Sequence, residues 1–97
     1  MAVAVEMNFK GATLDQYDEV MRLMSLDDGT RQSPPGALFN WVAKTDDGIR
    51  VVDVWETKEQ FEKFAQEEIG PYTQQAGIPA PPEMKFTEVH NHLERTS

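Results

Sequence analysis

The sequence predicts an α+β domain of the ferredoxin-like type, in which the order β-α-β-β-α-β forms a four-stranded antiparallel sheet with two helices on one face. Two observations lead to this prediction. Residues 48–69 pass directly from a strand pattern into a capped amphipathic helix, and residues 2–28 contain a similar strand-to-helix unit. A chain of 97 residues has room for one domain, so residues 1–97 are treated as a single unit.

The first unit starts with a strand at residues 2–9, where apolar residues alternate with small or polar ones. Its apolar positions are Val3, Val5, Met7 and Phe9. Thr13 and Gln16 then form a Thr-x-x-Gln capping box at the start of a helix, which is expected to end before Gly29. The buried stripe of this helix consists of Leu14, Tyr17, Val20, Met21 and Met24.

The second and third strands form a hairpin. Residues 27–36 are loop by composition, and residues 37–44 are the second strand. If Asp47-Gly48 is a two-residue type I′ turn, Val42 lies opposite Asp53. One face of the hairpin then carries Phe39, Trp41, Ala43, Val52 and Val54. The other face carries Asn40, Val42, Lys44, Val51, Asp53 and Trp55.

The second unit repeats the capping box at Thr57 and Gln60, and its helix is expected to end at Gly70-Pro71. The apolar stripe of that helix is Phe61, Phe64, Ala65 and Ile69. A connector rich in Pro and Gly follows at residues 72–82, and the last strand is predicted at residues 83–93. One side of this strand carries Met84, Phe86, Glu88, His90 and His92.

Both faces of the predicted hairpin carry large apolar groups, yet two helices can cover only one face of the sheet. Trp41 and Phe39 lie opposite Leu38 and Val42 in the second strand, so a monomer would leave one of the two apolar surfaces in water, as a larger patch than soluble monomers usually expose. We therefore expect a two-fold homodimer in which two sheets face each other. The alternative is that a few of these residues are simply exposed.

Composition argues against several classes of function. The net charge of −8 disfavours nucleic acid and anionic membranes as partners. The absence of cysteine excludes disulfides, thiolate metal sites and cysteine nucleophiles. The sequence shows no phosphate-binding loop, nucleophile elbow or His-Glu-x-x-His motif, so no cofactor and no metal are predicted. It also shows no signal peptide or membrane span, and a cytoplasmic location is expected.

The run at residues 51–64, Val-Val-Asp-Val-Trp-Glu-Thr-Lys-Glu-Gln-Phe-Glu-Lys-Phe, is followed by Ile-Gly-Pro-Tyr at residues 69–72 and by Gly77. This pattern resembles the dimeric α+β barrel superfamily, in which a strand ending in Trp leads to a helix with paired Phe residues and then to Pro and Gly. The superfamily includes antibiotic-biosynthesis monooxygenases that need no cofactor, polyketide cyclases, haem-degrading monooxygenases, hydroxynitrile lyases and stress-responsive proteins. The resemblance implies a homodimer and a ligand held between the sheet and the helices.

Individual branches of the superfamily differ at positions that this chain can be compared with. Where the haem-degrading branch has a Trp and an iron-binding His, this chain has Phe64 and Gln74, which argues against haem. The cyclase branch has a His on the last strand and a Tyr just ahead of that strand. His90 or His92, together with Tyr72, would take those places.

Three residues are the candidates for catalysis. His90 would act as a general base, and it is preferred to His92 because it lies deeper in the predicted strand. A metal held by both His side chains with Glu88, or a solvated strand end, are the alternatives. Asp53 is either a pocket acid with a raised pKa or an ion-pair partner of a basic neighbour. Tyr72 would orient the ligand, or donate a proton to it, at the mouth of the pocket.

The candidates for ligand contact are Asn40, Trp55, His92, Tyr17 and Met21. Asn40 would hold a carbonyl group, or else serve as a polar group of the dimer interface. Tyr17, Met21 and Trp55 would line the pocket, but core packing is the interpretation that their positions favour.

Taken together, the sequence predicts a small homodimer that binds an apolar, aromatic or polyketide-like molecule between sheet and helices. If the chain is an enzyme, it is expected to be a cofactor-independent monooxygenase or a cyclase or lyase that works by proton transfer. The alternative is a non-catalytic protein, either a ligand-binding protein or a structural dimeric barrel.

Overall fold

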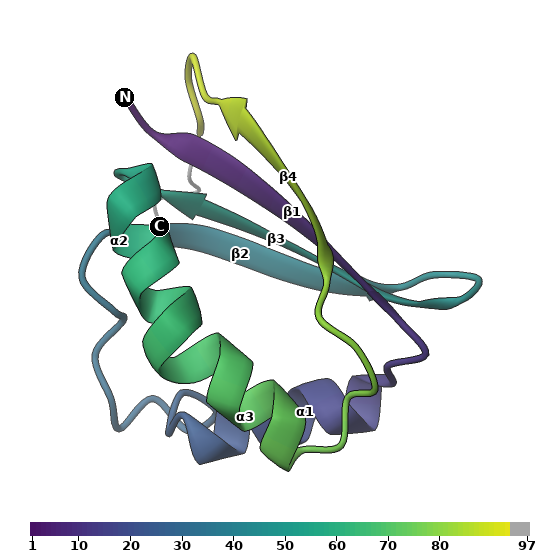
Figure 1. The fold of residues 1–97 in the computed structure, drawn as a ribbon. Coiled ribbons are helices and arrows are strands. Elements are labelled where there is room, and N and C mark those ends of the chain that lie inside the picture. Colours follow the sequence, from purple (N-terminus) through teal and green to yellow (C-terminus); the bar gives the residue numbers. More distant parts are fainter. Residues whose placement is uncertain (94–97) are drawn as a thin grey trace.

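The computed structural model describes residues 1–93 and confirms the predicted fold class (Figure 1). The elements in chain order are β1 (Val3–Lys10), α1 (Leu14–Leu23), β2 (Ala37–Lys44), β3 (Gly48–Trp55), α2 (Lys58–Phe64), the π-helix η1 (Ala65–Ile69), α3 (Gly70–Gln75) and β4 (Glu83–Glu88). The strands form one sheet in the order β2-β3-β1-β4, and all neighbouring strands are antiparallel. Helix α1 and the continuous helical run from α2 to α3 lie on the same side of this sheet.

The hydrophobic core lies between the sheet and the helices. Strand β1 places Val3, Val5, Met7 and Phe9 on the helix side, each buried, as its alternating pattern predicts. Strand β3 adds Ile49, Val51 and Trp55 to the same side. The helices contribute Val20, Met24 and Phe61, and the connector before β4 contributes Ile78.

The two helix starts differ more than their sequences indicate. The capping box of α1 is complete, with Gln16 N–H donating to Thr13 Oγ1 at 3.1 Å and Thr13 N–H donating to Gln16 Oε1 at 3.0 Å. At α2 only half of the box forms, because Gln60 N–H donates to Thr57 Oγ1 at 3.2 Å without the return bond. The side chain of Gln60 instead lies against Gly36, where an added Cβ would come within 2.3 Å of its Oε1.

The second helix was predicted to end at Gly70-Pro71, and this prediction is wrong. The helix continues to Gln75, because η1 at residues 65–69 changes the hydrogen-bond register just before the proline. Pro71 then falls in the first turn of α3, where a residue without an N–H is tolerated.

The β2–β3 register differs by two residues from the prediction. Asn40 lies opposite Asp53 and Val42 opposite Val51, and the turn consists of Asp46-Asp47, closed by a 2.9 Å bond from Thr45 N–H to the Gly48 carbonyl. A shift of two residues leaves every side chain on its predicted face. The reason lies at Gly48, where a Cβ would be 2.0 Å from the Phe9 carbonyl oxygen. This glycine serves the close approach of β1 and β3 and not the turn.

The last strand is shorter than predicted. Strand β4 ends at Glu88, opposite Val3 at the start of β1, and one further bond, from Val89 N–H to the Ala2 carbonyl at 2.9 Å, closes the pairing. His90 and His92 therefore lie beyond the strand, both exposed, and the predicted range 83–93 is corrected to 83–88. None of the helices described within residues 1–93 combines the length and the apolar character that a membrane crossing requires.

Candidate functional site

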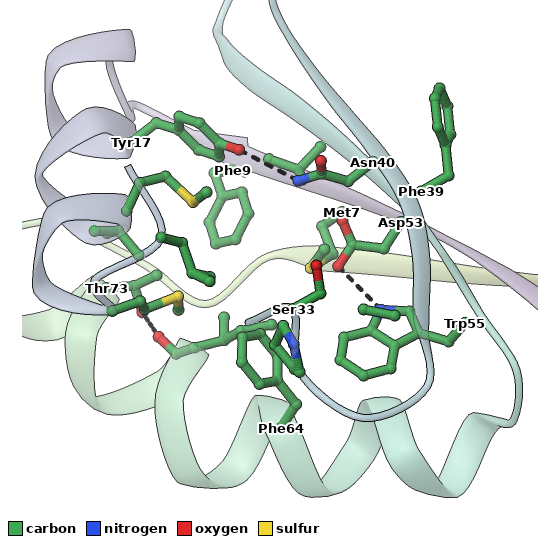
Figure 2. A pocket seen from close by; sticks show the side chains of 18 of the residues that line it. Met7, Phe9, Tyr17, Ser33, Phe39, Asn40, Asp53, Trp55, Phe64 and Thr73 are labelled. Atoms are coloured by element: carbon green, nitrogen blue, oxygen red, sulfur yellow. Dashed lines mark hydrogen bonds between the residues drawn. The ribbon is translucent and has the colours of Figure 1, made fainter. Parts of the chain in front are cut away.

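A cavity of about 420 Å³ lies between the helix side of the sheet and the helices (Figure 2). This volume lies within the range of about 300–1,000 Å³ that is typical of small-molecule sites. The sheet supplies Met7, Phe9, Ile49, Val51, Asp53 and Trp55 to its lining. Helix α1 and the loop after it supply Tyr17, Val20, Met21, Met24, Leu26, Ser33 and Pro34, and Phe64, Ile69, Thr73 and Ile78 complete the opposite wall. Most of the lining is apolar.

Asp53 is the exception in this apolar lining. It lies in the middle of β3 on the helix side, with 8% of its surface exposed. Its Oδ2 accepts a hydrogen bond from Trp55 Nε1 at 3.2 Å, whereas Oδ1 is buried and has no hydrogen-bond partner among residues 1–93. A buried acceptor without a partner costs free energy, which a core position would not ordinarily carry.

Burial raises the pKa of Asp53 from its ordinary value of 3.8 to about 6, and the hydrogen bond from Trp55 opposes this effect. The carboxyl group therefore changes its protonation state close to neutral pH. Such a group accepts and returns protons efficiently under physiological conditions. A raised pKa within a cavity is also typical of functional sites.

Tyr17 and Asn40 form a second polar pair in the cavity wall. Asn40 Nδ2 donates to the Tyr17 hydroxyl at 3.4 Å, and Asn40 lies directly across from Asp53 in the β2–β3 ladder. Burial raises the pKa of the Tyr17 hydroxyl, the bond from Asn40 lowers it, and the negative charges of Asp53 and Asp18 raise it further. The hydroxyl thus stays protonated and can donate its own hydrogen to a ligand.

The loop between α1 and β2 is held over the cavity by Arg31. Its guanidinium forms a two-pronged ion pair with Glu68 of η1, one prong being the 2.6 Å bond from Nη2 to Glu68 Oε2. Nη1 also donates to the Met24 carbonyl at 2.9 Å. This loop contributes Leu26, Ser33 and Pro34 to the lining. The contact therefore fixes one wall of the cavity.

The structure brings together five of the predicted site residues and leaves three apart. Asp53, Asn40, Trp55, Tyr17 and Met21 all line the cavity. His90 and His92 are exposed beyond β4, and Tyr72 packs half-buried against the core from α3; none of the three lines the cavity. Within residues 1–93 no three His, Cys, Asp or Glu side chains lie together as a metal site would require.

Sequence reasoning missed Ser33 and Thr73 as lining residues. Ser33 precedes Pro34-Pro35 in a long loop, and such loops often carry binding residues, so a signal existed. Thr73 had no signal, because η1 shifts the register of the helix at that point. Phe39 touches the cavity edge but points away from it, toward the other face of the sheet (Figure 2).

Solved structures share this fold over nearly their whole length. A candidate antibiotic biosynthesis monooxygenase from Chloroflexus aurantiacus is 24% identical, with a TM-score of 0.57, over 95% of this chain and 97% of that one. SnoaB, a cofactor-independent oxygenase from Streptomyces nogalater, is 14% identical with a TM-score of 0.60, over 97% of each chain. The ActVA-Orf6 monooxygenase of Streptomyces coelicolor, solved with nanaomycin D, is 19% identical with a TM-score of 0.54, over 98% and 92% of the two chains.

At these identities the likeness establishes the fold. The resemblance noted in the sequence is confirmed at the level of the fold, which this chain shares with these monooxygenases and this oxygenase. No protein-family model and no curated protein matches the sequence.

Proposed function

We propose that the chain binds a small, largely apolar aromatic molecule of the polyketide type and oxidises it with dioxygen as a cofactor-independent monooxygenase. The observation that carries this proposal is the buried carboxyl of Asp53, one oxygen of which lies in an apolar cavity and has no hydrogen-bond partner among residues 1–93. The fold neighbours support the reaction class, because they include a cofactor-independent oxygenase and a monooxygenase solved with an aromatic ligand.

The chemistry starts with proton transfer to Asp53. A ring methylene made acidic by a conjugated carbonyl loses its proton to Oδ1, and the negative charge moves to the carbonyl oxygen, where the Tyr17 hydroxyl donates a hydrogen bond. Dioxygen oxidises the resulting carbanion. The methylene becomes a carbonyl that keeps one oxygen atom, while the second oxygen leaves as water with both methylene hydrogens.

Asp53 takes the role of base that the sequence analysis gave to His90. His90 lies beyond β4, outside the cavity, whereas Asp53, Tyr17 and Asn40 lie close together. The same proton transfer would also begin a cyclisation. The second candidate function is a non-catalytic ligand-binding protein, which the half-enclosed apolar cavity supports by itself.

The pH dependence of turnover tests the proposal. With 1,8-dihydroxyanthrone as the probe, we expect kcat/KM to rise through about pH 6 and then level off, because Asp53 must be ionised to accept a proton. Quinone formation and oxygen uptake are measured together, after subtraction of the rate without protein. Absence of turnover would favour the ligand-binding function, whereas turnover independent of pH between 5 and 8 would rule out Asp53 as the base.

A variant of Trp55 links this profile to Asp53. The Trp55 N–H lowers the pKa of Asp53, so Trp55→Phe should move the midpoint of the profile to higher pH. Trp41→Phe is the matched control, because Trp41 lies on the opposite face of the sheet and should leave the midpoint unchanged.

We also propose that two chains pair through the uncovered face of the sheet. On that face 51% of Phe39 and 42% of Trp41 are exposed, beside the apolar Val52 and Val54. Sedimentation should give twice the chain mass of 11.0 kDa, and Trp41→Glu should give single chains. The matched control is Gln66→Glu, on the exposed side of η1, which should leave the mass unchanged. A wild-type protein that sediments as a single chain would refute the pairing.

A further inference from the structure

The charged residues around the cavity restrict the charge of the ligand that it can bind. Among the described residues 1–93, Asp53 is the one charged residue in the lining, and no Lys, Arg or His joins it there. Arg31, on the loop that closes the cavity, is already bound to Glu68 and to the Met24 carbonyl. Arg50 projects from β3 on the other face, where its Nε donates to Asn8. A ligand inside the cavity therefore finds no cation within the described part of the chain.

The hydrogen-bond donors in the lining do not replace a cation. The Thr73 hydroxyl donates within its own helix, with acceptors at 2.6 Å (Ile69 carbonyl) and 3.0 Å (Gly70 carbonyl). The Trp55 indole N–H already donates to Asp53 Oδ2 at 3.2 Å. The remaining side-chain donors of the lining are Ser33, Tyr17 and Asn40. Asn40 lies across the ladder from Asp53, and the negative charge of that carboxylate raises the pKa of the Tyr17 hydroxyl. A negatively charged group that reached Tyr17 or Asn40 would lie close to a second negative charge.

From these observations we infer that the cavity admits neutral aromatic ketones, phenols and esters and excludes aromatic carboxylates. A carboxylate would lose its hydration without gaining a partner and would be repelled by Asp53. The inference deepens the proposed function, because it specifies the ligand class of the same cavity. It also assigns a place in a reaction sequence: a precursor with a free carboxylate must first be decarboxylated, esterified or lactonised.

The test compares two probes that differ in charge on one ring system, 2-naphthoate and its methyl ester. At about pH 7.5 we expect the ester to bind at least about tenfold more tightly by calorimetry, although it is the larger molecule. The indole N–H resonance of Trp55 should shift with the ester, which places binding in the cavity because Trp55 lines it. Equal affinity for acid and ester would overturn the inference.

Two variants show whether the selection comes from the charge of Asp53. In Asp53→Asn the preference for the ester should shrink severalfold, while Asp46→Asn, on the exposed turn, should keep it. An unchanged preference in Asp53→Asn would overturn the assignment. If neither probe shifts Trp55, the aromatic ligand class itself is wrong. If the selectivity holds but the anthrone is not oxidised, only the proposed reaction fails.

Discussion

Replacing Asp53 with asparagine should lower turnover by about 10²–10⁴-fold, the range expected on removal of a general base. The amide has almost the same volume, and its oxygen can still accept the bond from Trp55. Binding of a neutral ligand should therefore persist. Loss of turnover with retained binding separates a missing base from a damaged cavity.

The same substitution should stabilise the protein at neutral pH. The Asp53 carboxyl has a pKa of about 6 when folded and 3.8 as its ordinary value, so ionisation at neutral pH opposes folding by about 3 kcal/mol. The sign follows from proton binding: between these two values the folded state holds more protons, so the free energy of unfolding falls as pH rises from about 4 to 6. Below that window the carboxyl is protonated in both states, and this penalty is absent.

Thermal unfolding of Asp53→Asn checks this prediction. At pH 7 recovery of the full ~3 kcal/mol would raise the melting temperature by roughly 12–24 °C, because about 1 kcal/mol corresponds to roughly 4–8 °C in a domain of this size. At pH 4 the difference should largely disappear. Asp46→Asn, on the exposed turn, serves as the control and should change neither stability nor turnover. A variant that loses stability would mean that the carboxylate supports the fold.

Gly48→Ala should destabilise the fold by roughly 3 kcal/mol or more. The new Cβ would lie 2.0 Å from the Phe9 carbonyl oxygen and 3.1 Å from the Gly11 nitrogen, both of them backbone atoms. Backbone atoms of a central strand cannot move aside as a flexible side chain can, so β1 and β3 must separate at this point.

Denaturant unfolding of Gly48→Ala provides the measurement. Gly29→Ala is the control, because that position has φ +75° and no atom within 4 Å of an added Cβ, so it reports backbone strain alone. We expect it to cost about 1–2 kcal/mol. Equal losses in the two variants would show that the contact with β1 yields at little cost and would weaken our account of the hairpin register.

Local patterns were enough to predict the fold class and the two faces of the sheet. The alternation in β1 and the Thr13 capping box depend on neighbouring residues only, and both appear as expected. The hairpin register was wrong by two residues because Gly48 was interpreted as a turn residue. Its actual constraint is a carbonyl on β1 that is distant in sequence, and a local pattern cannot show such a contact.

Only part of the site was predicted, because contacts between residues distant in sequence decide the rest. Asp53 stood out because a carboxylate between Val52 and Val54 in a strand is unusual, and the structure places it, buried, in the lining of the cavity. His90 was preferred as the base on the assumption that the last strand extends to residue 93. The pairing of β4 with β1 stops after the bond from Val89 to Ala2, a tertiary property that placed His90 outside the cavity.

The π-helix η1 gives this domain a means of changing its ligand without changing its scaffold. A π-helical turn closes its hydrogen bonds at i→i+5 and so holds about one residue more than an α-helical turn. If residues 65–69 were wound as an α-helix without a change of length, everything after them would turn by about 100° around the helix axis. Thr73 would then leave the cavity wall and a neighbour would take its place, while α1 and the sheet kept their positions. The lining of the cavity can therefore change through the winding of one helical turn as well as through substitution.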